Sequence, residues 1–146
     1  MLRRFTFWLW LALAFQFLTG AIHAISLFVT PSPADEVQRQ LLELMINYKQ
    51  DMGAGIHRSM MELFKALSSC FSLLCLLGAL TNLYLIRKNV GPDLVKGLVG
   101  IQVFVFGICF GVVAVLTFLP PTILCGLIFI CLATTYFIIP FESKEL

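Results

Sequence analysis

Two rows of polar side chains interrupt apolar segments of this chain, and they are the residues that could do chemistry. The first row is Gln16, Thr19, His23 and Ser26, and the second is Arg58, Glu62, Lys65, Ser69 and Ser72. The spacing within each row places its members on one face of a helix. Ionisable side chains within a membrane-spanning helix usually face the bundle or a cavity rather than lipid. We therefore expect the two rows to face one another.

This predicted cluster is compatible with three kinds of role. The first is structural, with intrahelical ion pairs from Glu62 to Arg58 and Lys65, and a hydrogen bond from His23 to a neighbouring helix. The second is a pocket for a lipid-like or other small apolar ligand. The candidate ligand-binding residues are Gln16, His23, Arg58, Glu62, Lys65 and Ser69. The third is proton transfer, quinone chemistry or haem chemistry.

Haem b would need axial ligands, and His23 and His57 are the two histidines of the chain. Their spacing matches no haem-binding motif, and His57 lies too near the predicted membrane surface to share a plane with His23. No phosphate-binding glycine loop, H-x-x-x-H metal motif or Ser/His/Asp arrangement occurs. We therefore predict no catalytic residue and no resident cofactor, and haem or quinone remains the alternative.

The composition places both rows in a membrane. Of the 146 residues, 60% are hydrophobic and 12% are charged, whereas soluble domains are about half apolar and a quarter charged. A soluble chain of this length has too small a core to hide that excess. No basic run with interleaved aromatic residues suggests nucleic acid. The lipid bilayer is the partner that the composition predicts.

Four apolar stretches are long enough for the about 20 helical residues that cross a bilayer. They cover residues 5–29, 61–86, 95–118 and 121–140. We predict an all-α membrane protein, a four-transmembrane-helix bundle forming a single membrane domain over residues 1–146. Pro120 and Pro121 predict a very tight turn between the last two helices.

Residues 33–50 predict an amphipathic extracytoplasmic helix between the first two spans. Ser32 fits the N-cap and Pro33 the first helical position. Apolar residues recur at helical spacing, at Val37, Leu41, Leu44, Met45, Tyr48 and Met52. We expect a lid over the outer end of the bundle, with Leu41, Met45 and Tyr48 buried. The alternatives are a helix in the lipid interface, which its low positive charge disfavours, and a docking surface for a partner.

Lysine and arginine placement predicts that both termini are cytoplasmic, because short cytoplasmic loops are enriched in these residues. This orientation places on the inside Arg3, Arg4, Arg87, Lys88, Lys96 and Lys144. The first apolar run could instead be a signal peptide cleaved after Ala24. Its length of about 18 residues exceeds the usual 7–15, and the polar row within it favours a retained span.

Small residues in the third span predict close helix packing. Gly107 and Gly111 form G-x-x-x-G, which allows helices to approach within the chain or, alternatively, in a homo-oligomer. Gln102 is the strongly polar residue in the middle of that span and could bridge helices. The five cysteines all lie in apolar segments, so they imply no disulfide framework and are expected to act as small apolar filler.

The layout resembles small bacterial four-helix integral membrane proteins without an assigned activity. The shared features are G-x-x-H near the end of the first span (Gly20, His23), a polar helical outer segment and a Ser-rich start to the second span. It resembles the DoxX-type proteins less closely, in size and layout. The fragment "HRSMME" is faintly similar to the H-x-N-x-x-E part of the membrane glutathione-transferase family, with Ser59 in the Asn position.

These features predict a small integral membrane protein, and the resemblance suggests the bacterial cytoplasmic membrane. The leading prediction is a non-catalytic accessory or assembly subunit of a larger membrane complex, or a binder of a small apolar ligand. The alternative is a membrane enzyme or redox protein that works at a polar pocket in the outer leaflet.

Overall fold

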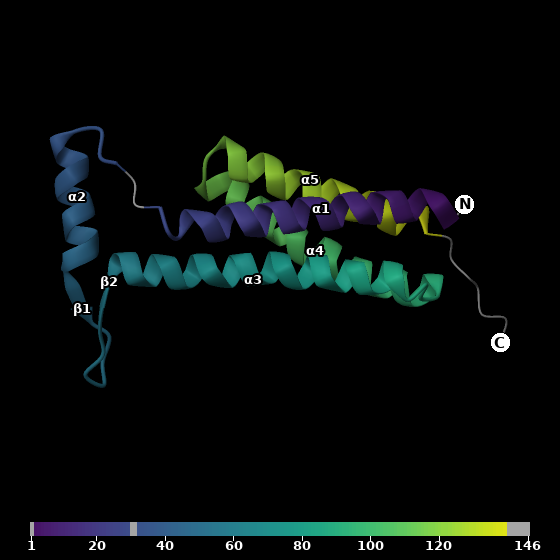
Figure 1. Cartoon of the computed structure of the whole chain (residues 1–146), viewed down its shortest axis with the longest axis horizontal. Coiled ribbons are helices and arrows are strands. Elements are labelled where there is room, and N and C mark those ends of the chain that lie inside the picture. Colours follow the sequence, from purple (N-terminus) through teal and green to yellow (C-terminus); the bar gives the residue numbers. More distant parts are fainter. Residues whose placement is uncertain (1, 30–31, 140–146) are drawn as a thin grey trace. The chain divides into compact units, whose positions relative to one another are not determined.

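The structure is a computed structural model that describes residues 2–29 and 32–139. Its elements follow the order α1 (Leu2–Ser26), α2 (Glu36–Asn47), β1 (Lys49–Asp51), β2 (His57–Ser59), α3 (Met60–Arg87), α4 (Pro92–Leu116) and α5 (Leu119–Ile138). Figure 1 shows four long helices and the short helix α2 between the first and second of them. The predicted all-α architecture is confirmed, with one small hairpin added.

Four helices are long and apolar enough to cross a membrane: α1, α3, α4 and α5. Each end of these four helices lies within three residues of the end predicted for the corresponding apolar stretch. The long apolar runs explain this agreement, because about 20 helical residues satisfy their own backbone hydrogen bonds across a hydrocarbon core. The chain is a small integral membrane protein.

The chain divides into two compact units. The first holds residues 1–20 and 74–146, and the second holds residues 21–73. The first unit therefore contains most of α1, the second half of α3 and the pair α4–α5. The second contains the end of α1, all of α2, the hairpin and the start of α3.

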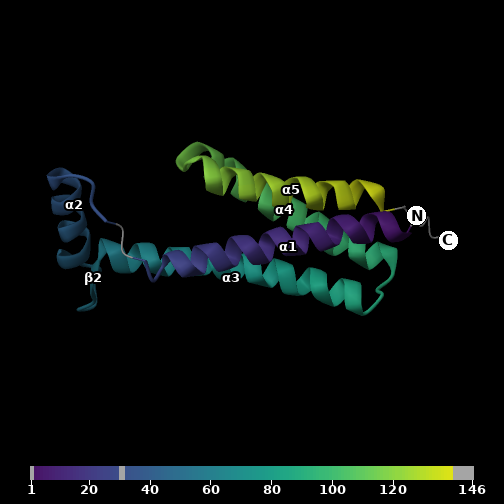
Figure 2. The same ribbon diagram turned by 45° about the horizontal axis from the view of Figure 1, so that its top comes forward.

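Helices α4 and α5 lie side by side (Figures 1 and 2) and interlock through glycines that receive aromatic rings. A Cβ added at Gly107 would lie 3.1 Å from the Phe129 ring, and one at Gly126 would lie 3.1 Å from the Phe110 ring. The two phenylalanine rings stack at 6.1 Å between centroids. Gly107 thus packs within the chain, as small residues in membrane helices commonly do.

Gly111, the second glycine of the G-x-x-x-G pattern, has no atom within 4 Å of an added Cβ. Gly107 is already covered by α5, whereas Gly111 is open. A homo-oligomer seam through Gly107 and Gly111 stays a prediction. Pro120 and Pro121 lie in the first turn of α5, where the absence of a backbone N–H costs nothing.

The outer segment differs from its prediction in two ways. Helix α2 begins at Glu36, not Pro33, and ends at Asn47, not Gln50. Asp35 rather than Ser32 is the N-cap, because its Oδ1 accepts a hydrogen bond from the backbone N–H of Gln38 at 2.8 Å. An aspartate three residues before a free helical N–H is a strong cap.

A β-hairpin follows α2 directly, where the sequence predicted continued helix and a turn. Strands β1 and β2 are antiparallel, with Gln50 opposite Arg58 and Asp51 opposite His57. Gly53, Ala54 and Gly55 all have positive φ in the connecting loop. Two glycines make this left-handed path inexpensive, and Asp51 Oδ1 accepts a hydrogen bond from the Gly53 N–H at 2.8 Å.

Candidate functional site

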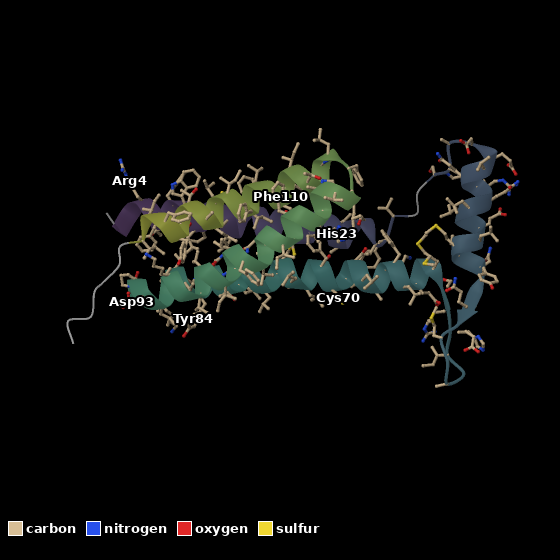
Figure 3. The ribbon with its side chains drawn as sticks, turned by 180° about the vertical axis from the view of Figure 1, so that it is seen from behind. Arg4, His23, Cys70, Tyr84, Asp93 and Phe110 are labelled. Carbon is tan, nitrogen blue, oxygen red and sulfur yellow. The ribbon has the colours of Figure 1, made fainter. Side chains whose placement is uncertain are left out.

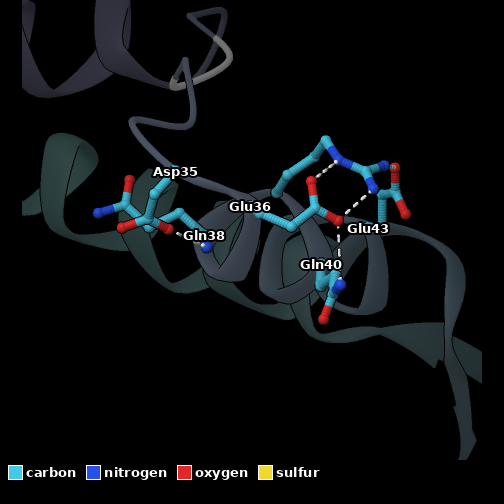
Figure 4. Close-up of polar contacts among 6 residues, drawn as sticks. Asp35, Glu36, Gln38, Gln40 and Glu43 are labelled. Atoms are coloured by element: carbon cyan, nitrogen blue, oxygen red, sulfur yellow. Dashed lines mark hydrogen bonds and ion pairs between the residues drawn. The ribbon is translucent and has the colours of Figure 1, made fainter.

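The polar side of α2 is held together by one arginine (Figure 4). Arg39 donates to Glu36 through Nε at 2.8 Å and to Glu43 through Nη1 at 2.6 Å. Gln40 also donates to Glu36, at 3.0 Å. Contacts at i, i+3 and i, i+4 join neighbouring turns and stabilise a helix. Arg39 is the single basic residue of α2, so these contacts leave the helix without an unpaired positive charge.

The hydrogen bond from Arg39 holds the pKa of the Glu36 carboxyl below its ordinary value of 4.5. A lowered pKa in the folded state means that this stabilisation is complete above the ordinary value and is lost as the pH falls through the folded-state pKa.

Helix α2 should therefore lose helicity as the pH falls below 4.5 and through the lowered pKa of Glu36, because a protonated Glu36 carboxyl no longer forms an ion pair with the Arg39 guanidinium. The measurement is the ¹³Cα chemical shift of Gln38–Asn47 across that range in the full chain. Glu36→Gln should flatten this pH dependence. An unchanged profile in that variant would assign the effect to another carboxyl group.

The apolar side of α2 is exposed. The side chains of Val37, Leu41, Leu44 and Tyr48 are 75%, 58%, 62% and 63% exposed, and no residue of the helix is buried. The prediction that this helix buries the side chains of Leu41, Met45 and Tyr48 is therefore wrong for Leu41 and Tyr48. Met45 is half-buried, whereas Val37, Leu41, Leu44 and Tyr48 are exposed. We call these four residues the α2 stripe.

A shallow depression of about 390 Å³ lies along one margin of the α2 stripe. Its walls combine apolar groups, acceptors and one carboxylate: Gln40, Glu43, Leu44, Asn47 and Tyr48. Arg39 engages Oε1 of Glu43, and Oε2 accepts no hydrogen bond among the described residues. The depression therefore offers a negative charge beside an aliphatic and an aromatic surface.

Glu62 belongs to a capping box at the start of α3. The backbone N–H of Ser59 donates to Glu62 Oε2 at 2.8 Å, and the N–H of Glu62 donates to Ser59 Oγ at 3.2 Å. This S-x-x-E arrangement satisfies two orphan donors of a helix start. Among the described residues, the ion pairs are those of Arg39 alone. The expected pairs of Glu62 with Arg58 and Lys65 are not formed.

The remaining predicted site residues of the second unit stand apart from a common centre. Arg58 is exposed on β2 and Lys65 is exposed on α3. Ser69 Oγ donates to the Lys65 carbonyl at 2.8 Å, within its own helix. His57 is exposed on β2. No hydrogen bond or ion pair joins the side chains of these four residues to one another.

His23 lies near the end of α1, in the second unit (Figure 3). Its ring packs edge-on against Phe71 of α3, with 5.1 Å between centroids. Ser26 Oγ donates to the His23 backbone carbonyl at 2.6 Å. The pocket expected to join His23 with Gln16, Glu62 and Lys65 stays a prediction.

Gln16 lies in a buried amide network of the first unit. It donates from Nε2 to Gln102 Oε1 at 2.9 Å and accepts at Oε1 from Asn82 Nδ2 at 2.8 Å. Gln102 Nε2 donates to Asn82 Oδ1 at 2.9 Å, which closes the ring. Three helices, α1, α3 and α4, are thereby joined in their apolar interior. Gln102 bridges helices as predicted, whereas Asn82 was not predicted.

Gly78 makes room for this network. A Cβ at that position would lie 2.5 Å from Gln16 Nε2 and 3.3 Å from Gln102 Oε1. Thr19, one helical turn after Gln16, is buried, and its hydroxyl has no hydrogen-bond partner among the described residues. The first unit therefore contains an amide-lined polar centre that the sequence indicated only in part.

The described residues contain no group of three or more His, Cys, Asp or Glu side chains that could hold a metal ion. The five cysteines are free, and Cys75, Cys125 and Cys131 are buried. Cys70 is exposed on α3 (Figure 3). The buried thiols fill apolar space, as free cysteines commonly do.

The site therefore consists of two features that belong to different units: the exposed α2 stripe with its depression, and the buried amide network. Comparisons of the chain with protein-family models, curated proteins and solved structures give no match.

Proposed function

We propose that this chain is a non-catalytic accessory subunit of a membrane complex and that it docks a partner protein through the α2 stripe. The observation that carries this proposal is the exposure of four large apolar side chains outside the candidate spans, three on α2 and the fourth at its C-cap, Tyr48. Exposed apolar residues of the spans are covered by lipid, but those of α2 need another partner. Exposed apolar patches with a polar rim are typical of protein–protein contacts.

The charges of α2 favour a protein over a lipid surface. Helices that lie in the membrane interface are usually rich in lysine and arginine, which attract anionic headgroups. In α2 the single cation is Arg39, and it is bound by Glu36 and Glu43. An acidic rim around an apolar stripe is repelled by an anionic bilayer and is suited to a protein with basic residues.

Photo-crosslinking in native membranes tests this function. With p-benzoylphenylalanine in place of Leu41, irradiation should give one discrete adduct with a protein. The same crosslinker in place of Lys88, in the turn after α3, is the control and should not give that adduct. Adducts with lipid alone, or no adduct at Leu41, would contradict an accessory role for α2.

The proposed orientation places both termini in the cytoplasm of a bacterial cell and α2 on the opposite side. Its support is the concentration of Lys and Arg at the two chain ends and in the α3–α4 turn. Reporter fusions after Lys88 and after Leu146 should both report a cytoplasmic position. An extracytoplasmic signal from either fusion would reverse the side on which α2 works.

A further inference from the structure

We infer that the depression on α2 receives an arginine or lysine side chain of the partner protein, which anchors the partner on the α2 stripe. This inference rests on the proposed docking function and specifies the chemistry of the partner. It follows from the charge, the acceptors and the apolar walls of the depression, each of which complements one part of a basic side chain.

The charge comes from Glu43. Its side chain is 57% exposed, and Arg39 binds it through one oxygen only. The segment from Asp35 to Asp51 carries four acidic residues against two basic residues, Arg39 and Lys49, so its net charge is negative and attracts a cation. Such complementarity speeds association and selects the partner, and salt weakens it.

The acceptors come from two amides. Gln40 donates through Nε2 to Glu36, which leaves its Oε1 free to accept. Asn47 also lines the depression. A guanidinium carries five N–H donors in a planar fork and can use a carboxylate and an amide oxygen together. Arginine therefore fits this wall better than lysine does.

The apolar walls come from Leu44 and Tyr48, both of which line the depression. Basic side chains bury their methylene groups along apolar surface while the charged end remains polar. A cation within about 6 Å of a tyrosine ring is also attracted by the face of that ring. Leu44 and Tyr48 thus suit the methylene stem of a basic side chain, and the Tyr48 ring also suits its charged end.

The test uses the full chain in native membranes, with p-benzoylphenylalanine in place of Leu41 as the probe. Glu43→Gln should reduce the yield of the protein adduct at least threefold. Asp51→Asn is the matched control, because it also removes one exposed carboxylate but Asp51 lies on β1 and does not line the depression, and asparagine keeps an Oδ1 to accept from the Gly53 N–H. This control should keep more than half of the yield.

A charge exchange completes the test. Glu43→Arg should abolish the adduct, and replacing the basic residue of the partner that lies at the crosslink with glutamate should restore it. Equal yields in Glu43→Gln and in the unsubstituted chain would overturn the basic-anchor inference while leaving the docking function in place. Equal losses in the Glu43 and Asp51 variants would also overturn it, since net charge alone would then explain binding. A lipid adduct, or no adduct even with Glu43 present, would overturn both proposals.

Discussion

Replacing Gly78 with alanine should lower the free energy of unfolding by about 2–4 kcal/mol. The added Cβ would lie 2.5 Å from Gln16 Nε2, so the Gln16 amide must move. The amide at the end of a glutamine side chain is usually mobile, but that of Gln16 is buried and hydrogen-bonded to both Gln102 and Asn82. Overpacking costs about 1–3 kcal/mol, and interhelical hydrogen bonds in membranes contribute about 0.6–2 kcal/mol each.

Thermal or denaturant unfolding in detergent measures this loss. Gly111→Ala is the matched control, because Gly111 also lies within a candidate span and has no atom within 4 Å of an added Cβ. That control should be neutral or stabilise the chain slightly, since alanine is the better helix former. Combining Gly78→Ala with Gln16→Ala should cost less than the two separate losses together. Equal effects of the Gly78 and Gly111 substitutions would show that the network does not fill this space.

Asn82→Leu should destabilise the chain by about 1–3 kcal/mol, the usual cost of leaving buried polar groups unpaired. The substitution deprives Gln16 Oε1 of its donor and Gln102 Nε2 of its acceptor. Substituting leucine for all three network amides should cost less than the three single losses together, because no unpaired amide then remains.

The same unfolding measurement applies, with Thr81→Val as its control. Thr81 is adjacent to Asn82, but its hydroxyl bonds only to the Leu77 carbonyl of its own helix. We expect that control to change stability by less than about 0.5 kcal/mol. Strictly additive losses from the three amide substitutions would show that the amides act independently.

The four spans could be predicted because long apolar runs have few other stable structures in a membrane. The hairpin could not, since "KQD" and "HRS" are short, polar strands without the alternation that marks a half-buried sheet. The signal that was available is the loop between them, where two glycines flank Ala54. It predicted a turn but not the pairing on either side.

The amide network was visible in part. Gln16 and Gln102 are isolated polar residues in apolar runs, and each indicated an interhelical contact. Asn82 has the same property and carries the same signal. The capping box was also readable, because Ser59 and Glu62 have the S-x-x-E spacing before an apolar run. In this box the Glu62 carboxylate accepts a hydrogen bond from the backbone N–H of Ser59 at the start of α3, so its charge needs no partner in the bundle.

The exposure of α2 could not be predicted, because periodicity shows that a helix is amphipathic but not what covers its apolar face. A lid, a lipid surface and a partner protein all demand the same pattern at Val37, Leu41 and Leu44. The low positive charge of the helix already disfavours a lipid surface in the sequence, and the binding of Arg39 to both neighbouring carboxylates supports the proposed protein partner further.

Spin-label accessibility of the α2 stripe tests the central claim most directly, which is that this face meets protein and not lipid. Purified chain is reconstituted into bilayers without other proteins, with one label at Leu41, Glu43 or Val115 in turn. Val115 is 81% exposed on α4 and is the lipid-facing reference. We predict that the Leu41 label is as accessible to a water-soluble nickel chelate as the Glu43 label. A Leu41 label that is shielded from the chelate and open to oxygen, like the Val115 label, would contradict the account.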